Sequence, residues 1–505
     1  MSTCSAGAAR APDHPEGGRR DGAESSSMSD QPAPAAHDSN NPENLLRFMM
    51  TGWAAMPGSP ASPVEGVERF AARRAALSAA FAGETLVVAT GREKVRANDT
   101  THRFRPGTDF YYLTGNLEPD NVLVLEPSGG GHAATLYCEP NPGKSDATFY
   151  TDRMKGELWV GPRLGLPQTA QRYGIATKSL SAFQDDLAAA VTRGPYRALR
   201  GVDPALDAAL PMQAERDGAF ATFLSEMRLI KDELEVRELR RAVEATHAAF
   251  DDVVRALPTA HTERVIEGVF NLRARVDGND VGYTTIAATG PNATTLHWTR
   301  NDRTIGDNEL LLLDAGVEAE TLYTADVTRT LPISGTFTPE QRAIYELVLA
   351  AQDAALERCK PGNEFLEPNR AAMRVLARGL EQLGILASAD EALRDENLFY
   401  KRYSLHNVSH MLGLDVHDCA AARAETYKFG ALRPGMVLTV EPGLYFQLDD
   451  LTVPARYRGI GVRIEDDVLI TETGVDVLSA AIPRRTDDVE AWVSSARVAT
   501  SRFSP

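Results

Sequence analysis

The chain has 505 residues, of which 43% are hydrophobic and 24% are charged, and its formal net charge is −17. This length predicts more than one domain, and the acidic balance argues against a nucleic-acid partner, which needs clustered Lys and Arg. No run approaches the roughly 18 apolar residues that a membrane helix needs, so we expect no membrane partner.

Residues 1–60 are rich in Ala, Gly, Ser, Pro and Asp and show no sustained apolar period. Such a segment buries too little apolar surface to offset the entropy of ordering it, so we predict a disordered N-terminal tail. The tail lacks the basic and then apolar pattern of a secretory signal. The four cysteines are widely separated and form no metal-binding pair, which favours a reduced, cytoplasmic location.

Residues 61–222 predict an α/β domain, because helical and strand-like patterns alternate there. Residues 67–81 have the spacing of an amphipathic helix. Strand-like runs, separated by Gly and Pro, are expected at 85–90, 110–114, 121–125 and 134–138. The domain is expected to end near Ala221.

Residues 223–493 predict a second domain of long helices and short strands. One helical pattern runs from Phe223 through Ala256, and another covers 262–276. Strands and turns follow, interrupted by helices at 338–357 and 367–383; the first begins with Thr338 as N-cap and a Pro in its first turn. Residues 494–505 are predicted to be a loose C-terminal tail.

Four acidic residues of the second domain stand in apolar, strand-like runs: Asp314, Asp326, Glu441 and Glu465. An ionised carboxylate among Val, Leu and Ile is costly unless it is paired or bound to metal. Any one of them is equally well explained as a partly exposed residue or a salt-bridge partner. Four in one region indicate a site that neutralises two divalent cations.

Three of the ten histidines, His406, His410 and His417, fall within twelve residues. On a helix, His406 and His410 would share a face, as in zinc sites, but the Glu of the metalloprotease zinc helix is missing. Four carboxylates and one imidazole favour Mn²⁺, Co²⁺ or Zn²⁺. Two such ions, about 3.5–4 Å apart, polarise a scissile carbonyl, so the pattern indicates a dinuclear hydrolase without specifying its substrate.

The motifs around these residues resemble those of the pita-bread metallopeptidases, specifically the aminopeptidase P (Xaa-Pro aminopeptidase) family. The matching blocks are Leu313-Asp-Ala-Gly, Ala325-Asp-Val-Thr-Arg-Thr, His406-x-x-x-His410-x-x-Gly-Leu-Asp-Val-His-Asp, Thr439-Val-Glu-Pro-Gly-Leu-Tyr and Tyr457-Arg-Gly-Ile-Gly-Val-Arg-Ile-Glu-Asp-Asp. Weaker similarity upstream includes Asp109-Phe-Tyr-Tyr-Leu-Thr-Gly and Glu157-Leu-Trp-Val-Gly-Pro-Arg. The resemblance implies an N-terminal creatinase/aminopeptidase P-type α/β domain, followed by a C-terminal pita-bread catalytic domain that removes an N-terminal residue standing before proline.

The resemblance also implies a ligand set for two divalent ions, with Mn²⁺ expected first and Co²⁺ or Zn²⁺ as alternatives. Asp314 would bind one ion, His410 and Glu441 the other, and Asp326 and Glu465 would bridge the pair. One departure is that the segment between Asp314 and Asp326 is one residue longer than is typical of the family. Turns absorb such insertions, so we expect ligation to be unaffected.

Further roles follow from the same resemblance. His297 and His417 match histidines that contact the substrate or the transition state, and Glu441 is also the candidate for handling the proton of the nucleophile. Tyr283 and Arg463 would orient the bridging ligands. His406 would line the pocket for the proline ring, and Trp159 would help to close the site around the free amine of the substrate. Tyr283 as a packed strand tyrosine and Trp159 as a domain-interface aromatic are the alternatives.

Several related functions compete with this interpretation. Prolidases share the fold and ligands but take only Xaa-Pro dipeptides, and the Tyr457-to-Arg463 block favours aminopeptidase P over them. Methionine aminopeptidases typically have no equivalent N-terminal domain, and creatinase-like enzymes use no metal. A pita-bread protein without activity would be a peptide-binding module, which bound-metal stoichiometry would reveal. We expect peptides with proline in second position as substrates, and a homodimer or homotetramer.

Overall fold

The computed structural model describes residues 41–54, 61–98, 100–141 and 143–501, with side chains to residue 496. Most of the predicted N-terminal tail, and the last four residues of the C-terminal one, lie outside these residues. The chain divides into a small unit, formed by residues up to 56 together with 142–161, and a large unit, formed by 57–141 together with 162–505. Among the residues described, no helix is both long enough and apolar enough to cross a membrane.

The small unit consists of short helices: α1 (Glu43–Met49), a 3-10 turn (Gly143–Ser145), α4 (Thr148–Thr151) and α5 (Glu157–Val160). Helix α1 lies in the segment predicted to be disordered, so that prediction is wrong for these seven residues. Its first turn carries Glu43 and its last turn Arg47, charges that stabilise the two ends of a helix. Because the surrounding sixty residues are rich in Ala and Gly, the sequence analysis did not recognise this short helix.

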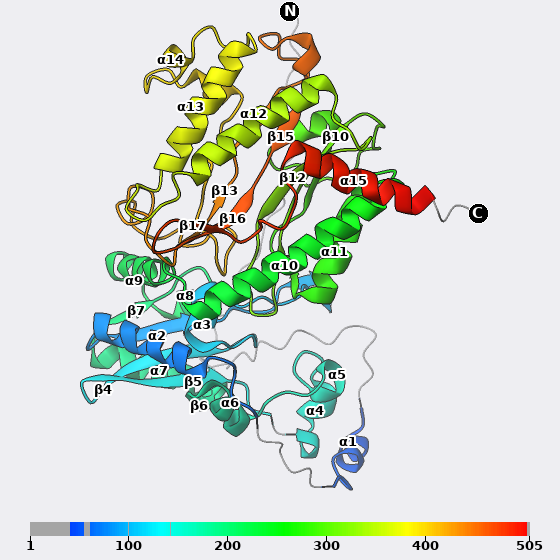
Figure 1. Cartoon of the computed structure of the whole chain (residues 1–505). Coiled ribbons are helices and arrows are strands. Elements are labelled where there is room, and N and C mark those ends of the chain that lie inside the picture. Colours follow the sequence, from blue (N-terminus) through cyan, green and yellow to red (C-terminus); the bar gives the residue numbers. More distant parts are fainter. Residues whose placement is uncertain (1–40, 55–60, 99, 142, 502–505) are drawn as a thin grey trace, which may run out of the picture. The chain divides into compact units, whose positions relative to one another are not determined.

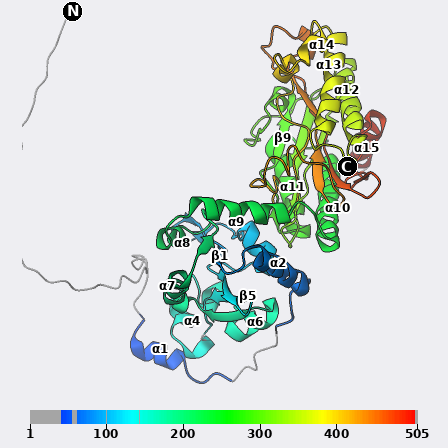
Figure 2. The same cartoon turned by 90° about the vertical axis from the view of Figure 1, so that its left-hand side faces the viewer.

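The N-terminal part of the large unit, residues 61–141 and 162–227, is an α/β domain. Its mixed sheet has the strand order β6-β5-β4-β1-β7. Alternate residues of β1 belong to different cores, because Leu86 and Val88 pack with Leu77 of α2, while Val87 and Ala89 pack with Leu187 of α7. Figure 2 shows α2 and α7 on opposite sides of β1.

Helix α2 and strands β1, β4 and β5 match predicted elements, and most of the other elements were not predicted individually. The elements of this domain are α2 (Val67–Ala80), β1 (Thr85–Ala89), β2 (Val95–Ala97), β3 (Thr100–Thr101), α3 (Thr108–Thr114), β4 (Val122–Ser128), β5 (Gly131–Cys138), α6 (Leu166–Tyr173), β6 (Ala176–Ser179), a 3-10 turn (Leu180–Ala182), α7 (Phe183–Arg193), β7 (Tyr196–Ala198), α8 (Pro204–Ala209) and α9 (Ala214–Met227).

Three predictions in this region differ from the structure. Residues 110–114 were expected to form a strand but lie in helix α3, which ends at Gly115 with φ 68°; a short, fully buried apolar run does not distinguish the two by periodicity. The single long helix expected from Phe223 to Ala256 is two helices, because Asp232 caps α10 (Glu233–Ala256) through a capping box with Glu235. The predicted domain boundary at 222 falls inside α9.

The C-terminal part of the large unit contains two three-stranded sheets, in the orders β12-β10-β9 and β13-β16-β17, and the ribbons β11-β8 and β14-β15. Helices α10 and α11 pair with each other, as do α12 and α13 (Figure 1). The elements are α10, α11 (Glu263–Asp277), β8 (Asp280–Val281), β9 (Ile286–Thr289), a 3-10 turn (Gly290–Thr294), β10 (Leu310–Ala315), β11 (Val317–Glu318), β12 (Val327–Pro332), α12 (Pro339–Leu356), α13 (Glu367–Gln382), α14 (Ala389–Ala392), 3-10 turns (Phe399–Arg402 and Ala455–Tyr457), β13 (Val437–Val440), β14 (Gly443–Tyr445), β15 (Gly461–Arg463), β16 (Asp466–Ile470) and β17 (Val475–Val477).

Helix α15 (Thr486–Ser501) extends past residue 494, so the prediction of a loose tail from that residue is wrong through Ser501. Val489 and Val493 are fully buried in the main core, and Ala496 is nearly so. These apolar positions continue the helical spacing past the expected boundary. The predicted start of α12 is confirmed, with Thr338 capping it and Pro339 in its first turn.

Candidate metal centre and substrate cavity

The four predicted acids lie at or beside the ends of strands. Asp314 is near the end of β10, Asp326 directly precedes β12, Glu441 directly follows β13, and Glu465 directly precedes β16. Three of them therefore stand just outside the strands in which the sequence predicted them. A hydrogen bond of 3.0 Å from the Glu465 N–H to the Thr328 carbonyl joins β12 to the β16 segment, which brings the carboxylates of both sheets together.

His410 lies in an extended segment beside β13. Its carbonyl accepts a 3.0 Å hydrogen bond from the N–H of Thr439. Because the segment is extended, His406 and His410 share no helical face. The His410 Nε2 atom lies 3.2 Å from Oδ2 of Asp326 and 3.4 Å from Oε1 of Glu441.

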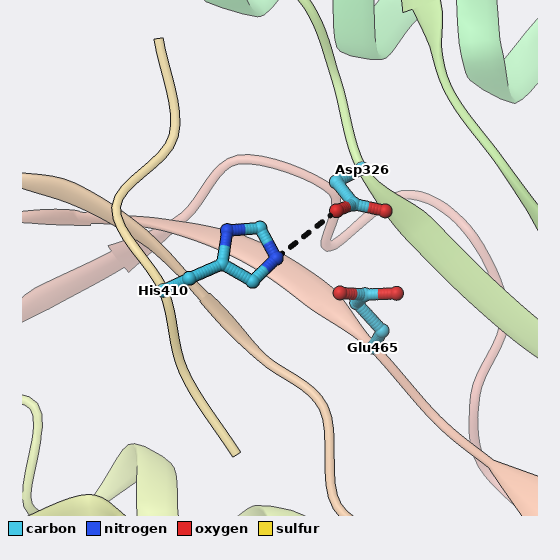
Figure 3. A group of neighbouring side chains, drawn as sticks. All are labelled: Asp326, His410 and Glu465. Carbon is cyan, nitrogen blue, oxygen red and sulfur yellow. Dashed lines mark ion pairs between the residues drawn. The ribbon is translucent and has the colours of Figure 1, made fainter. Parts of the chain in front are cut away.

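These side chains form a group with the composition of a metal site. One ligand atom from each of Asp326, His410 and Glu465 lies within 4.8 Å of the others. Figure 3 shows the imidazole and the two carboxylates converging on a common point from separate parts of the chain. The donor set of carboxylate oxygens with one imidazole is that of Mn²⁺, Co²⁺ or Zn²⁺.

Tyr283 connects Asp314 to this group. Its hydroxyl lies 2.6 Å from Oδ1 of Asp314 and 2.5 Å from Oδ1 of Asp326. A phenol has a single proton, so it donates to one of these oxygens at a time. The phenol therefore holds the two carboxylates side by side.

Arg463 supports the opposite side of the cluster. Its guanidinium donates to Oδ2 of Asp314 and, over 3.1 Å, to the hydroxyl of Thr328. That hydroxyl in turn donates to Oε2 of Glu465 over 2.7 Å. The guanidinium also donates to the Tyr445 hydroxyl over 2.9 Å. The Arg463 cation therefore holds the Asp314 carboxylate of β10 directly and the Glu465 carboxylate beside β16 through Thr328.

The buried carboxylates of the cluster carry negative charge that additional cations would stabilise. Burial raises the pKa of Asp314 and raises that of Glu465 well above its usual value, in each case with a neighbouring carboxylate adding to the effect. Burial raises the pKa of Glu441 to about 7, although His410 opposes the rise. Burial alone would lower the pKa of His410, but Asp326 and Glu441 raise it to about 9. Two divalent cations fit this excess of buried negative charge.

A cavity of about 580 Å³ opens over these residues. Its lining includes all of the site residues predicted from the sequence except Trp159: Tyr283, His297, Asp314, Asp326, His406, His410, His417, Glu441, Arg463 and Glu465. Trp159 belongs to the small unit, where its indole N–H donates to the carbonyl of Tyr150 over 2.7 Å. Its role at the site stays a prediction.

Three histidines line the cavity around the cluster. The rings of His417 and His410 meet edge to face, with 4.4 Å between centroids. The Nε2 atom of His406 lies 2.8 Å from the Tyr445 hydroxyl, and burial, together with the charge of Arg463, lowers the pKa of His406 to about 4. His297 follows the 3-10 turn after β9. A neutral imidazole such as that of His406 can donate a hydrogen bond from one ring nitrogen and accept one at the other.

The sequence analysis missed residues that hold the predicted ones in place. Thr328 and Tyr445 contact Arg463, and Asp467 accepts a 3.0 Å hydrogen bond from the N–H of Asp326. All three occur within the quoted motifs, beside residues that were singled out, so their place in those motifs was the available signal. Glu263, which holds the loop around His297 through hydrogen bonds to Thr289, Asn292, Trp298 and Arg303, lies in no such motif.

The segment between Asp314 and Asp326 contains a turn. Strands β10 and β12 keep an unbroken register, in which Asp314 faces Thr328. The turn closes with a hydrogen bond of 2.9 Å between the Ala319 N–H and the Tyr323 carbonyl, and Leu322 has φ 65°. The ligand positions are therefore compatible with the longer segment.

Comparisons with known proteins identify similarity across both domains. A family model described as metallopeptidase family M24 matches residues 237–472, and one described as the N-terminal domain of aminopeptidase P matches residues 70–197. Xaa-Pro aminopeptidase 1 of Streptomyces coelicolor is 50% identical over 457 residues, which cover 90% of this chain and 92% of the relative. Xaa-Pro aminopeptidase of Escherichia coli is 34% identical over 440 residues, covering 82% and 95%.

Solved structures agree with the sequence comparison. A variant of E. coli aminopeptidase P in complex with substrate matches with a TM-score of 0.78 at 32% identity, covering 86% of this chain and 100% of that one. The structure of Pseudomonas aeruginosa aminopeptidase PepP matches with a TM-score of 0.77 at 33% identity, covering 86% and 99%. The predicted fold, an α/β N-terminal domain followed by a pita-bread catalytic domain, is confirmed.

Proposed function

Because the chain belongs to the aminopeptidase P family, within metallopeptidase family M24, we propose that the cavity around Asp314, Asp326, His410, Glu441 and Glu465 is its active site. The enzyme is a metal-dependent Xaa-Pro aminopeptidase, which hydrolyses the bond between an N-terminal residue and a following proline. The observation that carries the proposal is the convergence of these five side chains, from four separate motifs and an extended segment, in one cavity.

The proposed ligand set divides between two divalent ions. Asp314 would hold one ion, His410 and Glu441 would hold the other, and Asp326 and Glu465 would be shared by both. Asp314 and Asp326 both lie within hydrogen-bonding distance of the Tyr283 hydroxyl, which supports the bridging role of Asp326. Glu465 lies close to both Asp326 and His410, which supports its own bridging role. When bound, such a pair polarises the scissile carbonyl and makes a water molecule nucleophilic near neutral pH. We propose Mn²⁺ as the native metal, on the oxygen-rich donor set.

The remaining side chains act on the substrate. His297 and His417, which line the cavity, would donate hydrogen bonds to the carbonyl oxygen as its negative charge develops. Glu441 is the candidate to hold the proton of the attacking water and pass it to the departing nitrogen. His406 lines the pocket for the proline ring, and its neutral form suits an apolar ring.

The proline preference has a physical basis in the substrate. An Xaa-Pro bond is a tertiary amide without an N–H, and the ring fixes φ, so recognition depends on ring shape and on the free amine. Trp159 is proposed to help close the amine end. The alternatives of a dipeptide-only prolidase, a methionine aminopeptidase and a metal-free module are less well supported, because similarity to Xaa-Pro aminopeptidases extends over both domains.

Metal titration tests the metal part of the proposal. Protein stripped with a chelator and dialysed should take up two Mn²⁺ per chain, and the regain of hydrolysis should follow that uptake. Asp326→Asn should retain fewer than two ions. Uptake of no metal by the wild-type chain would contradict the proposal.

Location and assembly complete the proposal. We propose a cytoplasmic enzyme, because Cys138, Cys359 and Cys419 are free and buried, as is usual in a reducing compartment. We also propose a homodimer or homotetramer, on the family resemblance. Size-exclusion chromatography with light scattering that gives only the monomer mass would contradict the assembly.

A further inference from the structure

The position of the His417 imidazole depends on the backbone that carries it. Within the described part of the chain, no group hydrogen-bonds to this ring, and its defined ring contact is the edge-to-face one with His410. Its placement is therefore set by residues 411–418, here called the histidine loop. The Asp418 N–H donates to the Met411 carbonyl over 2.9 Å, which closes the loop on itself.

The N-terminal domain holds the middle of the histidine loop directly. The Arg105 guanidinium donates to the carbonyl of Leu414, and the Thr108 hydroxyl donates to Oδ1 of Asp415 over 2.6 Å. The same guanidinium forms an ion pair with Glu318 of β11 over 2.6 Å. Arg105 thus joins the N-terminal domain, the loop and the turn that follows β10.

The end of the histidine loop is held by a chain of buried charges. Asp418 accepts a hydrogen bond of 2.9 Å from Nε of Arg228 and lies 3.3 Å from the ammonium of Lys231, and all three side chains are almost fully buried. The other side of the Arg228 guanidinium donates to Asp109, in the first turn of α3. Two cations and two carboxylates therefore link α3 to the residue next to His417.

Apolar packing reinforces these polar contacts. Leu412 and Leu414 of the loop are buried in the same core cluster as Phe110 and Leu113 of α3. Space around the loop is also tight, because a Cβ on Gly413 would lie 2.1 Å from Oδ2 of Asp418. The loop is thus part of the core of the N-terminal domain rather than of the catalytic domain alone.

We propose that the N-terminal domain is a positioning element of the active site, which acts on His417 through the histidine loop. Arg105 and Thr108 hold the middle of the loop, and Asp109 holds its end through Arg228 and Asp418. The inference rests on the proposed function, since it takes His417 to contact the substrate. Asp109 and Thr108 touch no reacting atom; they are positioning residues, whose effect on turnover passes through His417.

A double-mutant cycle in the full-length, metal-loaded enzyme tests this coupling. Asp109→Asn removes the negative charge that faces Arg228, and it should lower kcat by about 10- to 100-fold, with KM nearly unchanged. In the His417→Ala background the same substitution should lower kcat by less than about twofold, because its target is already missing. A purely structural role for Asp109 would lower kcat equally in both backgrounds.

Arg69→Gln supplies the control. It removes an ion pair of 2.6 Å between α2 of the N-terminal domain and Asp232, the N-cap of α10, and this contact does not reach the histidine loop. The variant should keep wild-type kcat. Metal content and thermal midpoint are measured for every variant, so that a loss of folded or loaded enzyme is not counted as a loss of positioning.

The outcomes separate this inference from the proposed function. Equal losses in both backgrounds, or an unchanged kcat in Asp109→Asn, would overturn the inference. A wild-type enzyme without metal-dependent cleavage would overturn the proposed function instead. A fully active His417→Ala variant would overturn the role proposed for His417, and with it this inference, but not the aminopeptidase activity. If Asp109→Asn does not fold, the cycle is run with Thr108→Val, which removes only one hydroxyl, is expected to cost about 3- to 10-fold in kcat, and is judged by the same two results.

Discussion

Glu263 accepts a hydrogen bond of 2.8 Å from the indole of Trp298, the residue that follows His297. Glu263 is fully buried at the start of α11. Four further donors reach its carboxylate: the N–H and hydroxyl of Thr289, the side-chain amide of Asn292 and the N–H of Arg303. All five donors belong to residues 289–303, so one carboxylate organises the loop that carries His297.

The first prediction concerns this carboxylate. Glu263→Gln replaces an acceptor oxygen with an amide that repels the donors around it, so the loop should lose its fixed shape. We expect kcat/KM to fall by about 10- to 100-fold, with the bound metal unchanged. Steady-state kinetics and metal analysis measure the two quantities.

Glu267→Gln is the matched control for this substitution. Glu267 lies one turn further along α11, is half-buried, and has no hydrogen bond to its side chain among the described residues. The control should retain wild-type kinetics within about twofold. Equal losses in both variants would mean that α11 as a whole, and not the bonds to the His297 loop, sets the activity.

The second prediction concerns the phenol between two proposed ligands. Tyr283→Phe removes the hydroxyl that lies within hydrogen-bonding distance of Asp314 and Asp326. Metal affinity should weaken by about 10- to 100-fold, as is usual when a group that orients ligands is lost. Competition with a chelating dye measures it. An unchanged affinity would show that the carboxylates keep their positions without the phenol.

The third prediction concerns stability. The Arg329 side chain is fully buried and donates to Asp466, which is also fully buried. Arg329→Met removes the nearer cation of that buried carboxylate and leaves only Arg484, 3.8 Å away, so the free energy of unfolding should fall by about 3–5 kcal/mol. Urea unfolding at pH 7 measures the loss. Arg374→Met removes an ion pair with Glu367 that is partly exposed, and it should cost less than about 1 kcal/mol.

The fourth prediction concerns pH. Two hydrogen bonds from Arg402, of 2.9 and 3.0 Å, hold the pKa of Asp450 well below its usual value. Because the pKa is depressed in the folded state, this contact stabilises the fold above the unfolded value of about 3.9, and the stabilisation is lost as the pH falls through the folded value. Asp450→Asn should lower the thermal midpoint at pH 7, and the difference from wild type should shrink below about pH 4. A difference that stays constant down to pH 3 would contradict this.

The sequence predicted the elements whose pattern is local. The strands β1, β4 and β5 and the helices α2, α11, α12 and α13 follow from periodicity and from start signals such as Thr338. Helix α3 was mistaken for a strand, because all its residues from Phe110 to Thr114 are buried. The C-terminal helix α15 was not predicted, because its packing against the core, through Val489 and Val493, is a tertiary contact.

In the candidate site, too, the local features could be predicted from the sequence and the long-range contacts could not. The proposed ligands stand in contiguous motifs with distinctive spacing, so the sequence was sufficient to nominate them. The contacts that hold them are not contiguous: Asp109 reaches Asp418 through Arg228, and Glu263 lies more than thirty positions before the indole that it binds. No local pattern relates such partners, because the fold alone brings them together.

The most direct test of the account is peptide selectivity. Metal-stripped enzyme, with and without added Mn²⁺, is assayed on an Xaa-Pro-Xaa tripeptide, an Xaa-Pro dipeptide and an Xaa-Ala-Xaa control. The account predicts Mn²⁺-dependent release of the N-terminal residue from the tripeptide, at a rate well above those for the other two. Preference for the dipeptide, or for the alanine peptide, or an absence of metal-dependent cleavage of all three, would contradict it.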